Sequence, residues 1–280
     1  MNRGEKRILL SSLSGHPLWV VFLVLAAYGA WFMLPVLLGK TPGAEAELVG
    51  LDKAQAMFGG ELVVAVVLAL FVTAIGWWRK TGFTPMEKGS LKFLLIPLVF
   101  ALFLHQMLTL GAPEEHALFG FTSPGQVLMT VLTVLLLGFN EEMVFRGITF
   151  YGFSTVTHPI LAVVIAALIF GLFHYVNLFG GQEFVATTYQ VLHAMAAGFM
   201  YGAMRLITGA IWPVMLFHGF WDLNLWSVQT VNGPGKDAEA AAADLVLNTG
   251  MVLTVVLPAL LYGIFLCWRW SVRRRAGIPA

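Results

Sequence analysis

The chain has 280 residues, of which 59% are hydrophobic and only 11% are Asp, Glu, Lys or Arg. Soluble domains carry about 25% charged residues, so this composition excludes an ordinary soluble core and indicates a protein of the lipid bilayer. The net charge of +1 gives no reason to expect nucleic acid as a partner. The single cysteine, Cys267, excludes an internal disulfide and a multi-cysteine metal cluster.

Apolar segments follow one another along the chain, and a membrane-spanning helix needs roughly 20 mostly apolar residues. The basic N-terminus leads into an apolar run without an evident cleavage site, which predicts an anchor and not a signal peptide. No linker separates two domains, so the sequence predicts one all-α, polytopic membrane domain over 1–280. Its expected spans, about eight, are 17–39, 60–78, 91–110, 125–151, 159–176, 184–207, 210–228 and 249–270.

Lysine and arginine indicate the orientation, because cytoplasmic loops are rich in them. With both termini inside, 13 of the 16 basic residues fall on the inner side, counting Arg146. The other three are Lys40, Lys53 and Lys236. This bias predicts cytoplasmic termini and an even number of spans. The short loops and the lack of a targeting signal favour a prokaryotic plasma membrane.

The fourth segment contains charges among its apolar residues. It reads LLLGFNEEMVFRGITF over 135–150, with Glu141, Glu142 and Arg146 inside. A charge at the bilayer centre costs about 2.5 to 3.5 kcal/mol and usually faces a bundle interior or a wet cavity. Residues four apart share a helix face, so Glu142 can pair with Arg146 while Glu141 points elsewhere. The pattern predicts one neutralised glutamate and one available for chemistry, and a purely structural ion network is the alternative.

Two further segments carry polar residues at depth. The fifth ends with His174, four residues after Phe170, and the seventh holds His218 and Asp222, again four apart. Because three spans each place polar groups at depth, the sequence predicts one shared polar cavity within the membrane. The bias of Glu141 toward the inner face predicts that this cavity opens to the cytosol.

The sixth segment has Ala194, Gly198 and Gly202 at intervals of four, a pattern that lets helix backbones approach closely. His193 in the same segment and His105 in the third are interpreted as packing residues. A role in the site is the alternative for both.

The polar residues fit hydrolysis by an activated water. Glu141 and His174 could deprotonate the water, and His218 and Asp222 could hold the developing oxyanion. Asp222 would need a proton to donate a hydrogen bond, or would otherwise orient His218. Glu141, His174 and His218 could instead bind zinc, although the sequence has no HExxH motif. Serine-type GxSG and aspartyl-type GxGD elements are also absent.

Three short stretches carry a family resemblance. EEMVFRG (141–147), FGLFH (170–174) and HGFWD (218–222) resemble the signature motifs of the CPBP family, the CAAX-protease and bacteriocin-processing enzymes, also called Abi. The family pattern is EExxxR, FxxxH and then HxxxN or HxxxD on successive hydrophobic segments. The resemblance covers about residues 125–228, which form the predicted catalytic core region.

The resemblance implies an eight-helix intramembrane glutamic endopeptidase. It implies that Glu141 and His174 activate the water and that His218 and Asp222 hold the oxyanion. Asp222 stands where many members have Asn, which puts its role as a simple amide donor in question. The positions with supporting roles are Glu142, Arg146 and Phe170.

The expected partners are membrane lipids and a protein or peptide substrate, which can be lipidated or embedded in the membrane. No cofactor is favoured, and zinc is the alternative. Two other functions are weighed against the protease. A proton-coupled transporter predicts repeated halves with broken helices in matching positions, which the sequence lacks. A non-enzymatic immunity or regulatory protein would keep the ion network for structure alone.

Overall fold

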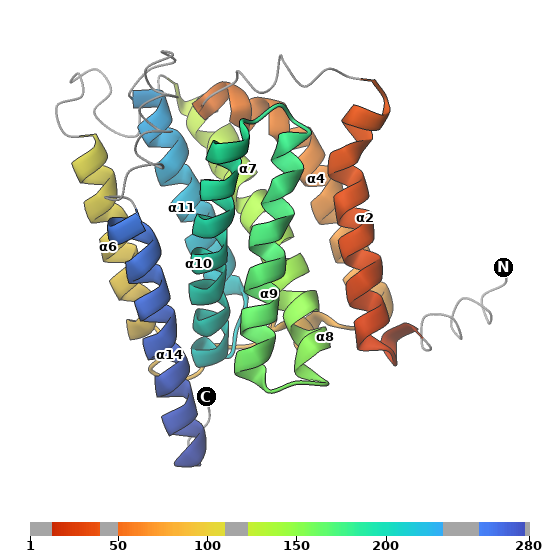
Figure 1. The fold of residues 1–280 in the computed structure, drawn as a ribbon, viewed down its shortest axis with the longest axis vertical. Coiled ribbons are helices and arrows are strands. Elements are labelled where there is room, and N and C mark those ends of the chain that lie inside the picture. Colours follow the sequence, from red (N-terminus) through yellow and green to blue (C-terminus); the bar gives the residue numbers. More distant parts are fainter. Residues whose placement is uncertain (1–12, 40–49, 110–122, 232–251, 278–280) are drawn as a thin grey trace, which may run out of the picture.

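The computed structural model describes residues 13–39, 50–109, 123–231 and 252–277. All regular structure in these ranges is helical, without a strand. The long helices run side by side (Figure 1). The elements are α2 (Pro17–Leu37), α4 (Gly50–Ile75), α5 (Trp78–Thr81), α6 (Lys92–Leu108), α7 (Pro124–Glu142), the π-helix η2 (Met143–Thr149), α8 (Phe150–Ser154), α9 (Pro159–Phe173), the 3-10 helix η3 (His174–Leu178), α10 (Phe184–Thr208), α11 (Trp212–Val231), the π-helix η4 (Val252–Val256) and α14 (Leu257–Arg275).

Helices lie at each of the eight predicted segments, as far as the structure describes them. The fourth segment comprises α7, η2 and α8, and α6 is a shorter apolar helix. The all-α, polytopic membrane class is therefore confirmed, whereas the total of eight spans stays a prediction. The stretches that are long and apolar enough to cross a membrane number five among the described residues: Pro17–Leu37, Ala54–Ile75, Pro124–Ser154, Pro159–Leu178 and Leu253–Arg275.

Arg146 is buried in η2, whereas most of the described basic residues of the predicted inner side belong to elements that meet at one end of the bundle. There the segment between α5 and α6 contacts the turn between α10 and α11. Glu87 N donates to Thr208 O over 2.8 Å, and Ile211 N donates to Gly82 O over 2.9 Å. α14 reaches the same end (Figure 1). The predicted orientation stays a prediction, because Lys40, Lys236 and both termini lie outside the described residues. The elements that meet at this end carry the following basic residues in α5, in the segment before α6, at the start of α6, and in the last turns of α10 and α14: Arg79, Lys80, Lys88, Lys92, Arg205, Arg273, Arg274 and Arg275.

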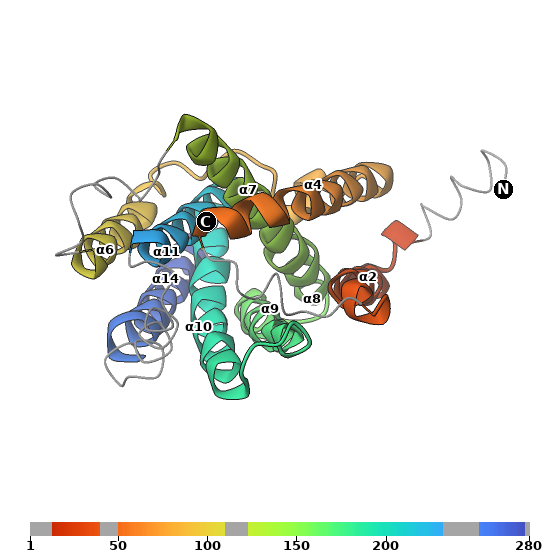
Figure 2. The same ribbon diagram turned by 90° about the horizontal axis from the view of Figure 1, so that it is seen from above.

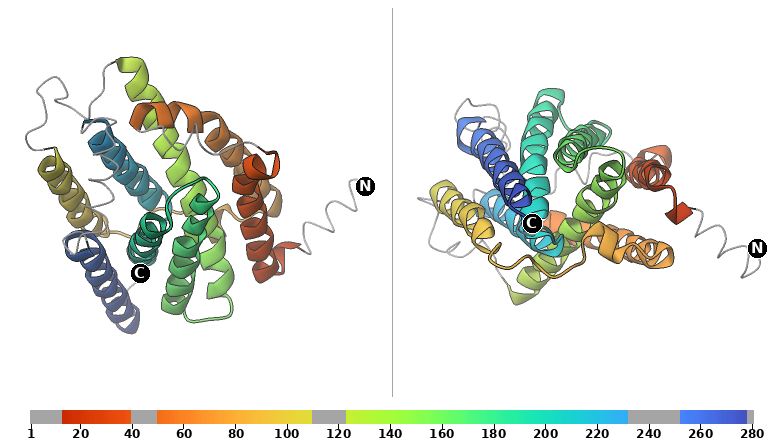
Figure 3. Two further views of the ribbon diagram at one scale, coloured as in Figure 1. Left: turned by 45° about the horizontal axis from the view of Figure 1, so that its top comes forward. Right: turned by 90° about the horizontal axis from the view of Figure 1, so that it is seen from below.

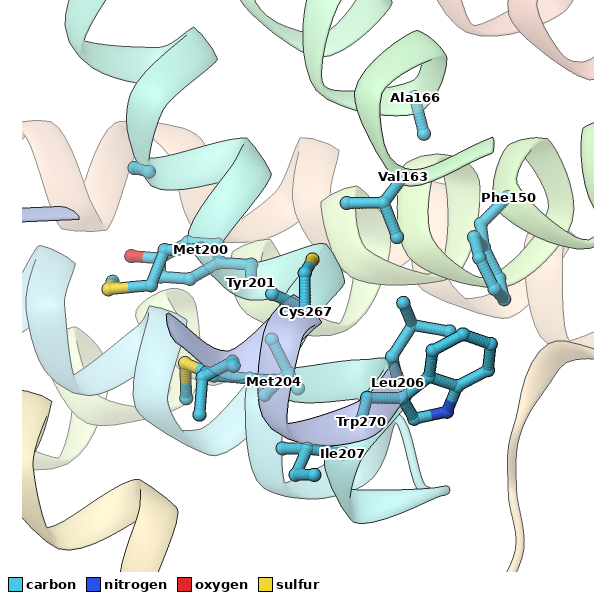
Figure 4. Close-up of a cluster of buried hydrophobic side chains, with 14 of the residues drawn as sticks. Phe150, Val163, Ala166, Met200, Tyr201, Met204, Leu206, Ile207, Cys267 and Trp270 are labelled. Carbon is cyan, nitrogen blue, oxygen red and sulfur yellow. The ribbon is translucent and has the colours of Figure 1, made fainter. Parts of the chain in front are cut away.

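One apolar core joins α8, α9, α10 and α14 (Figure 4). Small residues let α9 and α10 approach closely in this region, because a Cβ atom at Gly202 would lie 2.6 Å from Val163 Cγ1. The close approach predicted for the row of small residues in the sixth segment is therefore confirmed at this position. Van der Waals contact of the larger side chains around it stabilises the packing of α10 against its neighbours within the membrane.

A second core surrounds η2. Met143, Val144, Phe145 and Ile148 pack with residues of α2, α4 and α9. Seen from above, α7 lies between α11 and α4, while α2 and α6 stand at opposite edges (Figures 2 and 3). The segment that carries the charged motif is thus placed at the centre of the bundle.

Candidate active site

The motif EEMVFRG lies where α7 ends and a π-helix begins. Glu141 and Glu142 are the last residues of α7, and Arg146 lies in η2. All seven residues of η2 are buried. π-helical turns are rare and occur frequently at functional sites. The sequence predicts one span over 125–151, but its pattern did not reveal the π-helical geometry within that span.

Glu142 and Arg146 form the predicted ion pair. Arg146 Nη1 donates to Glu142 Oε1 over 2.8 Å, and the two side chains are 1% and 0% exposed. The guanidinium also lies against two aromatic rings, with its Cζ 4.0 Å from the Phe170 centroid and 5.3 Å from the Tyr201 centroid. A carboxylate and two ring faces therefore stabilise this buried cation. The pairing expected from the spacing of four residues is confirmed.

Gly198 on α10 gives the arginine its space. A Cβ atom at this position would lie 2.6 Å from Arg146 Nη2 and 2.9 Å from Phe170 Cδ1. Real Cβ contacts are essentially never that close, so a larger residue would displace the guanidinium or the ring. The small-residue row of α10 thus serves the site as well as helix packing.

His218 connects the two glutamates. Its Nδ1 lies 2.8 Å from Glu142 Oε1. Because that oxygen accepts from Arg146 and belongs to a carboxylate, we assign the hydrogen to His218 Nδ1. Its Nε2 lies 3.6 Å from both Glu141 Oε2 and Asp222 Oδ2. One imidazole therefore has Glu142 on one nitrogen and two further acids facing the other.

A close crossing of α7 and α11 brings these residues together. A Cβ atom at Gly138 would lie 2.5 Å from Met215 O, and one at Gly219 would lie 2.7 Å from Val134 O. The crossing is therefore compatible only with glycine at both positions. Gly219 directly follows His218, so the same contact fixes the distance between the histidine and the end of α7.

His174 caps the C-terminal end of α9. Its Nδ1 lies 2.9 Å from Phe170 O, and since a carbonyl only accepts, this nitrogen donates. The ring packs edge-on against Phe170, with centroids 4.8 Å apart, and Phe170 lies 6.1 Å from the His218 ring. No hydrogen bond or ion pair joins Glu141 to His174 in the described part of the chain. The two side chains are therefore not bonded directly to each other.

Exposure divides the acids into two kinds. The side chains of Glu141 and Asp222 are 16% and 14% exposed, whereas Glu142 is completely buried. Glu142 can therefore act only through Arg146 and His218. Glu141 and Asp222 are the carboxyl groups that a reactant can reach.

The sequence interpretation missed an acid on α4. Glu61 is 4% exposed, and its Oε2 accepts from Asn140 Nδ2 over 2.7 Å. Glu61 stands inside GGELVVAVVLAL, and Asn140 directly precedes the EExxxR motif. An acid near the start of the predicted span over 60–78 was a usable signal, and the sequence interpretation did not use it.

The two weaker histidine candidates differ in their surroundings. His193 stacks on Trp221, with centroids 5.7 Å apart and an interplanar angle of 26°. This contact supports the packing interpretation, although Trp221 is adjacent to Asp222. His105 lies on α6 at the edge of the bundle (Figure 2). A catalytic role of either residue stays untested.

The sequence predicts, as an alternative to a metal-free site, that Glu141, His174 and His218 bind zinc. In the ranges that the structure describes, no group of three or more His, Cys, Asp or Glu side chains is arranged to hold a metal ion. The choice between a metal-free and a zinc-dependent site remains a prediction for experiment.

The buried Glu–Arg–His cluster in an all-helical membrane bundle is the setting expected for intramembrane hydrolysis. Residues 123–224 match the family model described as type II CAAX prenyl endopeptidase, Rce1-like. The matched region contains all three motifs, and the resemblance to the CPBP and CAAX-protease family is confirmed. No curated protein and no solved structure matches the chain.

The family match indicates a CAAX-type intramembrane endopeptidase in a multi-pass membrane protein. Such an enzyme acts on a protein or peptide substrate in the membrane. The family match does not address how water is activated or which side chains take part.

Proposed function

We propose that the protein hydrolyses a peptide bond of a membrane-associated protein or peptide with a water activated by Glu141 and His174, without a covalent nucleophile or a metal. The observation that carries this proposal is the position of His218. Its Nδ1 is held by the sealed Glu142, while its Nε2 faces Glu141 and Asp222, the two acids that a reactant can reach. A purely structural ion network would not need one completely buried glutamate on one nitrogen of the histidine and two partly exposed acids on the other.

His174 is suited to accept a hydrogen bond from the attacking water. Because its Nδ1 donates to Phe170 O, the neutral ring keeps the lone pair on Nε2. A water between Glu141 and this ring would be held by both, and bridging waters are almost as favourable as direct hydrogen bonds. In the proposed step, the water oxygen attacks the substrate carbonyl carbon and its proton passes to Glu141. The carbon–nitrogen bond then breaks, and the proton is delivered to the leaving nitrogen.

His218 would stabilise the oxyanion that forms on the substrate carbonyl, and a protonated Asp222 would donate a second hydrogen bond to it. In this role His218 carries hydrogens on both nitrogens, with Glu142 holding Nδ1 and Nε2 donating to the oxyanion. Hydrogen-bond donors placed in advance typically lower such barriers by about 2.7 to 4 kcal/mol each. The 3.6 Å separation between His218 Nε2 and Asp222 Oδ2 supports an orienting role for Asp222 before substrate binds.

The proposed setting is a prokaryotic plasma membrane with cytoplasmic termini. Basic residues gather at the end of the bundle where α8 ends and α9 begins. This supports placing that end in the cytosol. The substrate would enter from this side, as a lipidated or hydrophobic segment.

Cleavage of a fluorogenic peptide panel, prenylated and unprenylated, by the purified protein in proteoliposomes tests the proposal. We expect the wild type to cleave at least one peptide and Glu141→Gln to be inactive at equal protein content. Cleavage that is as fast in Glu141→Gln as in the wild type would refute the mechanism. If no peptide is cut and both proteins behave alike in cells, the non-enzymatic interpretation replaces the protease.

A further inference from the structure

The proposed reaction makes no use of Glu61, a buried acid on α4. Its side chain is 4% exposed, inside a helix whose neighbouring residues are apolar. Isolated carboxylates are expensive in such surroundings, and membrane proteins keep them chiefly where they function. Glu61 therefore requires an explanation beyond membrane insertion.

A single amide fixes Glu61 in place. Asn140 Nδ2 lies 2.7 Å from Glu61 Oε2 and 2.9 Å from Glu61 O, and Asn140 is completely buried. Asn140 is adjacent to Glu141, at the last turn of α7 before η2. Glu61 is thus joined by one residue to the proposed catalytic base.

The carboxyl group of Glu61 is also within electrostatic range of two further acids of the site. Glu61 interacts electrostatically with Glu141 and with Asp222. Those two acids both face His218 Nε2 at 3.6 Å. Carboxyl groups from α4, α7 and α11 therefore influence one another at the face of the cluster that a reactant can reach.

A hydrogen bond to Asn140 does not by itself explain a carboxylate. A glutamine at position 61 would accept from Asn140 Nδ2 equally well and would cost less to bury. The pair is also incompletely satisfied, because Asn140 Oδ1 is buried without a hydrogen-bond partner among the described residues. An acid kept where an amide would hold the same contact indicates that the acid group itself, and not only the contact, has a use.

We propose that Glu61 is a positioning residue of the site: its carboxylate, held by Asn140, sets the position and the electrostatic surroundings of Glu141 and Asp222. The proposal rests on the peptidase function proposed above. Glu61 acts through these neighbours, so its loss should slow the chemical step while leaving substrate binding nearly unchanged.

The test is steady-state cleavage by Glu61→Gln, with a peptide that the wild type cleaves. This variant keeps the size and an acceptor for Asn140 but removes the charge. We expect kcat to fall on the order of ten- to a hundredfold, as for other small displacements of catalytic groups. KM should stay within about threefold, because substrate binding is preserved. The melting temperature should match that of the wild type. Glu183→Gln, the same change at an exposed acid, is the matched control with unchanged kcat.

A rescue separates charge from structure. The double variant Glu61→Gln with Asn140→Asp returns one carboxylate to the pair, and it should regain part of the kcat lost in Glu61→Gln.

If Glu61→Gln cleaves as fast as the wild type, Glu61 only connects α4 to α7 and the inference is wrong, while the protease function stands. If Glu61→Gln is slow only because it is unfolded and the double variant recovers nothing, a structural role is shown instead. If the wild type cleaves nothing, the proposed function itself fails and the inference falls with it.

Discussion

His218 Nδ1 and Glu142 Oε1 lie 2.8 Å apart across the crossing of α11 and α7, and both side chains are buried. The same carboxylate oxygen accepts from Arg146, also over 2.8 Å. Glu142 is therefore more than the neutralising partner of an arginine. It joins the buried cation of η2 to the histidine that faces the reachable acids, so the second glutamate of the motif orients the site.

The two adjacent glutamates should respond differently to the same substitution. Glu142→Gln leaves Arg146 without its carboxylate, and breaking a buried pair costs about 3 to 5 kcal/mol. We expect lower thermal stability together with loss of cleavage. Glu141→Gln should lose cleavage with a nearly unchanged melting temperature. The Glu141 side chain is partly exposed, and its Oε2 lies 3.6 Å from His218 Nε2, which is too far for a strong hydrogen bond. Equal melting temperatures of the two variants would contradict the division of roles.

Local patterns were enough to predict much of this molecule. Apolar runs located the helices because a span must be long and apolar, whatever its neighbours. The pairing of Glu142 with Arg146 followed from residues four apart on one helix. These features depend on short stretches of chain, and a sequence displays short stretches directly.

Contacts between distant segments were not predictable in the same way. The bond from His218 to Glu142 joins residues 76 apart, and the bond from Asn140 to Glu61 joins residues 79 apart. Both depend on which helices cross and at what depth, which apolar patterns do not specify. The π-helix η2 was missed for a related reason, since tertiary packing around a buried segment decides its geometry and its residue types do not.

Gly198 should tolerate no larger side chain. Gly198→Ala would place a methyl group 2.6 Å from Arg146 Nη2, and overpacking of this kind typically costs about 1 to 3 kcal/mol. We expect a lower melting temperature and weaker cleavage. Gly59→Ala on α4 is the control, because that position is exposed and open. Alanine there should be neutral or stabilising by up to about 1 kcal/mol. Equal effects of the two substitutions in thermal unfolding would show that Gly198 does not make room for the arginine.

Substitutions at Asp222 should distinguish hydrogen bonding from charge. Asp222→Asn supplies an amide that can donate to an oxyanion without a prior proton, so we expect cleavage within about tenfold of the wild type. Asp222→Leu keeps the branched shape of the side chain but neither donates nor accepts, and it should be inactive. Steady-state cleavage of one peptide by both variants makes the comparison. An inactive Asp222→Asn with native stability would mean that the negative charge beside His218 is itself required.

Removal of divalent metal should leave cleavage intact. Zinc ligands lie about 2.0 to 2.2 Å from the ion, and the described His, Cys, Asp and Glu side chains form no group of three arranged to hold one. We therefore expect equal cleavage rates before and after dialysis against a chelator. A rate that is lost on chelation and restored by zinc, but not by magnesium, would show that Glu141, His174 and His218 bind a metal.

Measuring the zinc content of the wild type and of His218→Gln gives an answer that does not depend on activity, because a zinc site built on His218 would lose its metal in that variant.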